Sequence, residues 1–161
     1  MLFRVLLVLF SAFILRGQQQ PAPALPVHVS AGLGYATFID ESDQSHVTAG
    51  AAARVYFTRR NAVEPELLYL YRDAADKDLL LGVNYVRDLG QARGRAVPYA
   101  IAGAGYVWGF RPRFTVSSGT LAGGFGVRFF AGERFFVSPE VRIGTEPILR
   151  VQLSFGWATR R

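Results

Sequence analysis

Residues 50–71 read GAAARVYFTRRNAVEPELLYLY, and this stretch decides the fold class of the chain. Apolar residues occupy every second position on both sides of the polar residues 58–61, and charged residues such as Arg54 and Glu66 lie between them. Alternation with a period of two predicts β-strands rather than a helix, and the polar residues predict a hairpin turn. A hairpin folded about Arg60 places Arg54 opposite Glu66, so we expect a cross-strand ion pair on the polar face.

The pattern returns in residues 124–143, GFGVRFFAGERFFVSPEVRI. Arg128 and Glu140 each lie 74 positions beyond Arg54 and Glu66 (128 − 54 and 140 − 66). The segments AGLGY at 31–35 and AGAGY at 102–106 form a second echo. A repeat of about 70 residues is longer than an ordinary solenoid unit. It predicts a barrel built from two similar groups of four strands.

Composition agrees with a single β domain in a chain of 161 residues. Half of the residues are hydrophobic, and 17 glycines accompany 13 Phe, 7 Tyr and 2 Trp. Cysteine is absent, which excludes disulfide and thiolate chemistry. The net charge is +6, but the arginines are scattered through expected turns and strands. Nucleic-acid binding needs a basic patch on one face, so we do not expect this chain to bind nucleic acid.

The chain divides into four expected segments. Residues 1–20 are predicted to be a signal peptide, because Arg4 precedes an apolar run at 5–15 that is too short to span a bilayer of about 30 Å. A retained N-terminal anchor is the alternative. Residues 21–26 form a Pro-rich N-terminal linker, residues 27–158 a barrel domain and residues 159–161 a short basic tail.

We expect eight strands in the barrel domain, and one of them has an ambiguous register. The echo of AGLGY would turn Gly103 and Gly105 inward, whereas Tyr99 and Ile101 favour the outside, and a bulge would reconcile the two. The expected strands cover residues 27–39, 46–57, a third ending near 72, 79–87, 97–108, 116–130, 135–145 and 148–157.

The two faces of these strands predict a membrane barrel. One face carries mostly Gly, Ala and Ser with a few charges, which suits the crowded lumen of a narrow barrel better than a surface in water. The bulky face then contacts lipid, and closure removes the strand edges that lipid does not tolerate. The predicted fold is all-β, an eight-stranded antiparallel up-and-down transmembrane β-barrel, and a soluble barrel or sandwich is the alternative.

Aromatic residues gather at the two ends of the expected strands, where membrane interfaces select them. By position, Tyr99 and Phe135 lie at the same end of the strands as Phe57 and Trp157. High strand propensity is the alternative explanation. The predicted interface aromatics are Phe57, Tyr85, Phe129, Phe155 and Trp157 at one end, and Tyr35, Tyr71 and Trp108 at the other.

The charged residues of the inward face predict a structural ion-pair network in the lumen. Buried charges need partners, so Arg54 and Arg128 are expected to neutralise Glu64 and Glu66. Two carboxylates about 7 Å apart on one strand face also allow glycosidase chemistry, which is the alternative reading. The predicted network comprises Arg54, Glu64, Glu66, Arg128, Glu140, Arg142 and Arg150, with Arg142 facing Arg150 across the last hairpin.

The motifs quoted above, with VEPEL at 63–67, VSPEV at 137–141 and a last strand ending in LSFGW, resemble the small eight-stranded outer membrane proteins of the opacity-protein and outer membrane protein A or X type. The resemblance covers residues 27–157. Four residues follow Trp157, whereas members of the family often end on the aromatic, and the loops are shorter than is common.

The resemblance implies a location in the outer membrane and a structural or surface-interaction role. A narrow pore for ions or small solutes and a soluble periplasmic lipocalin-like binder are the alternatives. It implies outer membrane lipids as partners and contact with the barrel-assembly machinery through the C-terminal strand. The natural ligand is unknown, and we predict no nucleic-acid partner and no cofactor.

We predict no enzyme, although some outer membrane barrels are lipid A deacylases that use His and Ser. His28 and His46 are expected near opposite ends of the barrel, so they cannot share a catalytic or metal site, and Ser45 and His46 point to opposite faces. The acidic groups at 40–43 and 73–78 lack the ligand spacing of a calcium loop. We expect them to form a solvated acidic rim.

Overall fold

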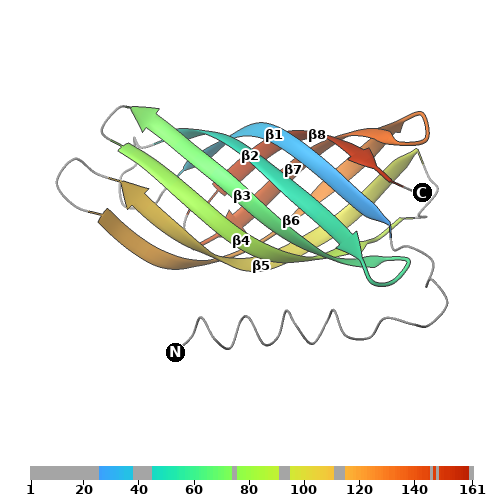
Figure 1. Ribbon diagram of the computed structural model, residues 1–161, viewed down its shortest axis with the longest axis horizontal. Coiled ribbons are helices and arrows are strands. Elements are labelled where there is room, and N and C mark those ends of the chain that lie inside the picture. Colours follow the sequence, from blue (N-terminus) through green and yellow to red (C-terminus); the bar gives the residue numbers. More distant parts are fainter. Residues whose placement is uncertain are drawn as a thin grey trace, which may run out of the picture.

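The eight strands close into an antiparallel barrel in which each strand pairs with its neighbour in sequence and β1 pairs with β8. The structure is a computed structural model (Figure 1), and it describes residues 26–37, 45–73, 76–90, 95–110, 115–145, 147 and 149–159. The prediction of an eight-stranded up-and-down barrel is therefore confirmed. The strands are β1 (Val27–Thr37), β2 (Ser45–Tyr56), β3 (Asn61–Asp73), β4 (Asp76–Asp88), β5 (Ala96–Phe110), β6 (Thr115–Ala131), β7 (Phe135–Gly144) and β8 (Leu149–Ala158).

The expected signal peptide at 1–20, residues 21–25 of the linker and residues 160–161 of the basic tail lie outside the described residues. Within the described ranges, no helix is long and apolar enough to cross a membrane. We call the barrel end that holds Val27 and Ala158 the terminal end. The opposite end, which holds Thr37, Ser45 and Asp76, is the loop end.

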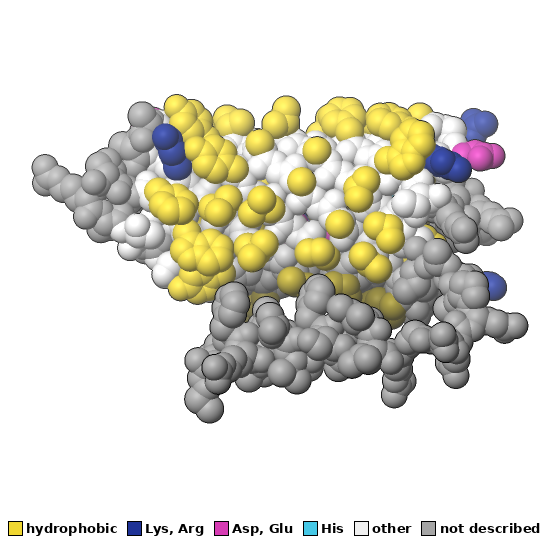
Figure 2. Space-filling view, in the orientation of Figure 1, with side chains coloured by type: hydrophobic (Ala, Val, Ile, Leu, Met, Phe, Trp, Pro, Cys, Tyr) yellow, Lys and Arg dark blue, Asp and Glu magenta, His cyan; other side chains and the backbone are white. Residues whose placement is uncertain are grey.

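Side chains alternate between lumen and outer wall along every strand, as strand geometry requires. In β3 the even-numbered residues from Ala62 to Leu70 are buried and the odd-numbered residues from Val63 to Tyr71 are exposed. The outer wall is apolar, with Leu33 64% and Phe125 68% exposed. Figure 2 shows hydrophobic side chains spread along the wall, while the charged side chains visible on that face gather towards its ends.

Strand β5 has one continuous register, and the expectation that Tyr99 and Ile101 point outward is wrong. Both are buried in the lumen together with Val97, and the pairing with β4 runs without interruption from Lys77 to Asp88. Space for the Tyr99 ring comes from Gly126 on β6, where an added Cβ would overlap the ring. A glycine on the neighbouring strand therefore allows a large aromatic residue into a narrow lumen.

The β2–β3 hairpin turns one residue earlier than expected, about residue 59 instead of Arg60, which moves its register by two residues. Val55 pairs with Val63 and Ala52 with Glu66, so the predicted opposition of Arg54 and Glu66 is wrong. The reason lies in the turn, where Phe57 N donates to Asn61 O at 3.0 Å and Asn61 N donates to Thr58 Oγ1 at 3.0 Å. These bonds centre the turn near residue 59 and bring Arg54 beside Glu64.

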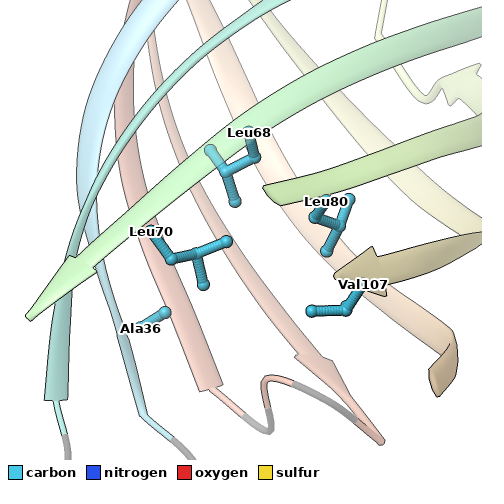
Figure 3. Packing of buried hydrophobic residues seen from close by; sticks show 5 residues of the cluster. All are labelled: Ala36, Leu68, Leu70, Leu80 and Val107. Atoms are coloured by element: carbon cyan, nitrogen blue, oxygen red, sulfur yellow. The ribbon is translucent and has the colours of Figure 1, made fainter. Parts of the chain in front are cut away.

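The lumen is filled by side chains in successive layers. Towards the loop end, Ala36, Leu68, Leu70, Leu80 and Val107 form an apolar cluster that we call the apolar plug (Figure 3). A second apolar cluster nearer the terminal end contains Tyr56, Ala62, Val86, Tyr99 and Ile101. Charged residues separate the two clusters, because Glu64 and Glu66 lie between Ala62 and Leu68 along β3. This filling defines the environment of every buried charge discussed below.

Candidate functional site

Glu66 is the centre of the ion-pair network in the middle of the lumen. Arg142 Nη1 donates to Glu66 Oε1 at 2.9 Å, and Arg150 Nη2 donates to Glu66 Oε2 at 2.9 Å. Arg142 also donates through Nε to Glu140 Oε1 at 2.5 Å and approaches Glu64 Oε1 at 3.5 Å. The Arg142 guanidinium thus contacts three carboxylates, and its contacts with Glu64 and Glu66 join β7 to β3 across the lumen.

Arg142 and Arg150 are direct cross-strand partners on β7 and β8, as expected for the last hairpin. Two like charges in this position repel each other unless carboxylates separate them. Glu66 contacts both, and Glu140 Oε1 lies 3.9 Å from Arg150 Nη2. Asn84 adds a neutral acceptor, since its Oδ1 accepts from Arg142 Nη1 at 3.0 Å.

Arg54 forms the second part of the network. Its Nε donates to Glu64 Oε2 at 2.6 Å, and its guanidinium carbon lies 4.3 Å from the centre of the Tyr99 ring. A guanidinium over an aromatic face is attracted by the electrons of the ring. The Tyr99 hydroxyl donates to Glu140 Oε2 at 2.8 Å and contacts Ser138 Oγ, so the ring joins the two halves of the network.

Arg128 belongs to a separate cluster at the terminal end, and the expectation that it neutralises Glu64 or Glu66 is wrong. Its guanidinium forms a buried ion pair with Asp88 and donates to the Tyr56 hydroxyl. Its Nη1 also lies 2.7 Å from His28 Nδ1. Tyr56 in turn donates to Asp88 Oδ2 at 3.0 Å, so this cluster satisfies its own charges.

Asp88 is the member of the two arginine-containing clusters that sequence reasoning missed. We expected the fourth strand to end at residue 87, one residue short of it, whereas β4 extends to Asp88. The signal was present, because Leu80, Asn84 and Val86 all point inward and the same alternation reaches Asp88. With it, four buried arginines (Arg54, Arg128, Arg142, Arg150) meet four buried carboxylates (Glu64, Glu66, Asp88, Glu140).

This arrangement suits cross-linking of strands better than catalysis. Glu64 and Glu66 both accept hydrogen bonds from guanidinium groups, so their oxygens already have partners. A glycosidase needs one of its two carboxyl groups protonated, with space for a sugar between them. The lumen beside these groups contains two small cavities of about 20 and 30 Å³. Each is large enough for one or two water molecules and too small for a sugar ring.

The acidic residues at the start of β4 do not form the expected solvated rim. Asp76 and Asp78 are buried and point into the lumen, where His46 from β2 lies beside them. Asp73 is exposed, and residues 40–43 lie outside the described residues. His28 lies at the terminal end opposite Ala158 and His46 at the loop end opposite Ala36, so the two histidines are separated by the length of the barrel.

The eight aromatics predicted for the membrane interfaces lie on the outer wall near strand ends, whereas Tyr99, which its position grouped with them, is buried in the lumen. Trp108 is half-buried, with its ring centre 4.8 Å from that of Tyr106. Tyr85 reaches the β2–β3 turn, where its hydroxyl donates to Asn61 Oδ1 at 2.8 Å. The exposed members are Phe57, Tyr85, Phe129, Phe155 and Trp157 towards the terminal end, and Tyr35 and Tyr71 towards the loop end.

Several solved structures have a fold similar to that of this barrel. Neisserial surface protein A superposes with a TM-score of 0.65 at 14% identity, covering 88% of this chain and 100% of that protein. The N-terminal β-barrel domain of Pseudomonas aeruginosa OprF gives a TM-score of 0.62 at 18% identity, with 83% and 96% covered. The chain has the fold of the small outer membrane β-barrels.

A further structure with this fold is Ail, the attachment invasion locus protein of Yersinia pestis, at a TM-score of 0.53 and 12% identity, with 84% of this chain and 99% of Ail covered. No protein-family model matches the sequence, and a search of curated proteins finds no match. The likeness to these proteins is therefore one of fold, seen in the structure and not in a sequence match. In that fold the apolar outer wall is the surface that contacts lipid.

Proposed function

We propose that the protein is a closed outer membrane barrel with a structural or surface-interaction role, both of its termini on the periplasmic side, and no enzymatic activity. The observation that carries this proposal is the filled lumen. The apolar plug and the ion-pair network follow one another along β3 and β4, so they obstruct the lumen at two successive levels. An eight-stranded barrel encloses little more than the space its own side chains fill.

The outer wall supports residence in lipid over the alternative of a soluble lipocalin-like binder. Exposed Leu33, Leu121, Phe125 and Ile143 come from three different strands, β1, β6 and β7, so apolar surface continues around the barrel. Soluble monomers rarely expose apolar patches larger than a few hundred Å². A lipocalin-like binder also requires an interior cavity for its ligand, whereas the lumen here is occupied by charged and apolar side chains.

The lumen also argues against the second alternative, a narrow pore. Arg142 and Arg150 reach across the lumen to Glu66, and opening a water path would require these buried pairs to separate. Breaking buried pairs is costly, so the closed state is expected to dominate. The remaining roles are those of a rigid wall element or a platform for surface contacts, and attachment is the role named for Ail among the proteins with this fold.

Two partners belong to this proposal. Outer membrane lipids would contact the apolar wall. The barrel-assembly machinery would bind the C-terminal strand β8, in which Leu149, Val151, Leu153, Phe155 and Trp157 all face outward.

The proposal is tested by locating the full chain and measuring its conductance. We expect it in the outer membrane fraction, with a folded form that migrates differently on a gel before and after heating. In a planar bilayer we expect no sustained conductance. Recovery as a soluble periplasmic monomer would exclude the membrane proposal. An ion-selective conductance that changes in Arg54→Ala would establish the pore instead.

A further inference from the structure

The loop end of the lumen holds a buried group of metal-ligating side chains from two strands. His46 projects from β2, and Asp76 and Asp78 project from alternate positions of β4, which puts both carboxylates on the lumen face. The His46 side chain is 2% exposed, that of Asp76 12% and that of Asp78 4%. Strand β3 separates the two strands, so closure of the barrel brings these residues together.

The distances within this group fit a shared ion better than direct hydrogen bonds. His46 Nε2 lies 3.4 Å from Asp76 Oδ1 and 3.7 Å from Asp78 Oδ2. An N–H···O hydrogen bond spans about 2.7–3.2 Å, which is shorter than both separations. Two ligands of one tetrahedral zinc ion, each bonded at about 2.0–2.2 Å, lie about 3.3–3.6 Å apart. One atom from each residue lies within 4.8 Å of the other two, so small side-chain movements complete the geometry.

We propose that His46, Asp76 and Asp78 bind one divalent transition-metal ion, with Zn²⁺ as the best match and water as the fourth ligand. The donor set decides the class of ion. Imidazole nitrogen favours zinc and its first-row neighbours, whereas Ca²⁺ and Mg²⁺ prefer sites made of oxygen atoms alone. Asp76 and Asp78 supply two carboxylates to a divalent cation, and Arg72 Nη1 lies 3.8 Å from Asp76 Oδ2, on the oxygen that does not face His46.

The surroundings of the group support this site. Residues of the apolar plug, shown in Figure 3, lie beside this group, since Leu70 pairs with Asp78 across β3 and β4 and Ala36 pairs with His46 across β1 and β2. Apolar neighbours lower the local dielectric and strengthen the attraction between carboxylates and a cation. Rigid strands position all three ligands, and the bound ion would join β2 to β4 at the loop end.

The test uses the full barrel, refolded in detergent and stripped with a chelator. Calorimetric titration with ZnCl₂ is expected to show one ion bound per chain, and thermal unfolding is expected to shift upward with added Zn²⁺. Asp78→Asn preserves the shape of the side chain, and it and His46→Ala should each weaken Zn²⁺ binding at least about tenfold. His28→Ala, at the terminal end, is the histidine control, and Glu133→Gln, in the exposed turn between β6 and β7, is the carboxylate control. Both variants should bind Zn²⁺ as the parent does.

Folding of each variant is verified by heat-dependent gel migration before titration. Three results would overturn the proposal. The first is no binding of Zn²⁺ by the parent barrel. The second is equal binding by the parent and by folded Asp78→Asn. The third is Ca²⁺ or Mg²⁺ binding as tightly as Zn²⁺, which would indicate an oxygen-only site elsewhere.

Discussion

At the scale of single residues, Arg54 tests whether the lumen charges stabilise the barrel. Its Nε donates to Glu64 at 2.6 Å and both side chains are buried. Arg54→Ala leaves Glu64 without its nearest cation, and breaking one side of a buried pair costs about 3–5 kcal/mol. We expect a loss of that order in the free energy of unfolding, measured in detergent. Arg60→Ala removes an exposed arginine from the adjacent turn, and it should change the free energy of unfolding by less than about 0.5 kcal/mol.

A double-mutant cycle tests the pairing itself. The cycle of Arg54→Leu with Glu64→Leu should give a coupling energy within about 0.5–3 kcal/mol, because the two residues are in contact. The double variant should lose less stability than the sum of the losses of the two single variants. The corresponding cycle of Arg54 with Glu66 should give a smaller coupling, since Glu66 is held by Arg142 and Arg150. Equal couplings in the two cycles would contradict the register of the β2–β3 hairpin.

At the scale of one element, β6 contains two glycines with opposite requirements. A Cβ at Gly124 would overlap the carbonyl oxygen of Val141 and lie 2.8 Å from the Arg142 Cα, whereas a Cβ at Gly119 meets nothing within 4 Å. Gly124→Ala should therefore cost about 1–3 kcal/mol through overpacking. Gly119→Ala should change stability by no more than about 0.5 kcal/mol. Unfolding of both variants under identical conditions measures the difference, and equal losses would contradict the close approach of β6 and β7.

At the scale of the whole molecule, the outer wall distinguishes a membrane barrel from a soluble one. Phe125 and Phe129 lie on the same face of β6, and Phe125 is nearer the middle of the strand while Phe129 is near its end. In a bilayer, arginine costs about 2–4 kcal/mol at the midplane and about 0–1 kcal/mol near an interface. Phe125→Arg should therefore destabilise the barrel in lipid vesicles more than Phe129→Arg does. Two small and equal effects would indicate that lipid does not surround this wall.

Most of the architecture could be predicted from the sequence, because it depends on local patterns. Alternation with a period of two predicts strands and separates the apolar wall from the small and charged inward face. Of the expected network, Glu66, Glu140, Arg142 and Arg150 do come together in one place. The prediction for Tyr99 was wrong for a physical reason. Its large ring favours the outer wall, and only the tertiary structure shows the space beside Gly126 that admits the ring to the lumen.

The sequence by itself thus determined the number of strands, their two faces and the buried charges in the middle of the strands. It did not determine the buried charges at the strand ends, such as Asp76 and Asp88. Only the tertiary structure decided which charges meet. A shift of two residues in a hairpin preserves the inward and outward faces, so alternation cannot distinguish Arg54–Glu64 from Arg54–Glu66. Contacts across the lumen depend on the tilt and stagger at which the barrel closes. That closure pairs Arg128 with Asp88 and brings His46 to Asp76 and Asp78, from strands that are not neighbours in the sheet.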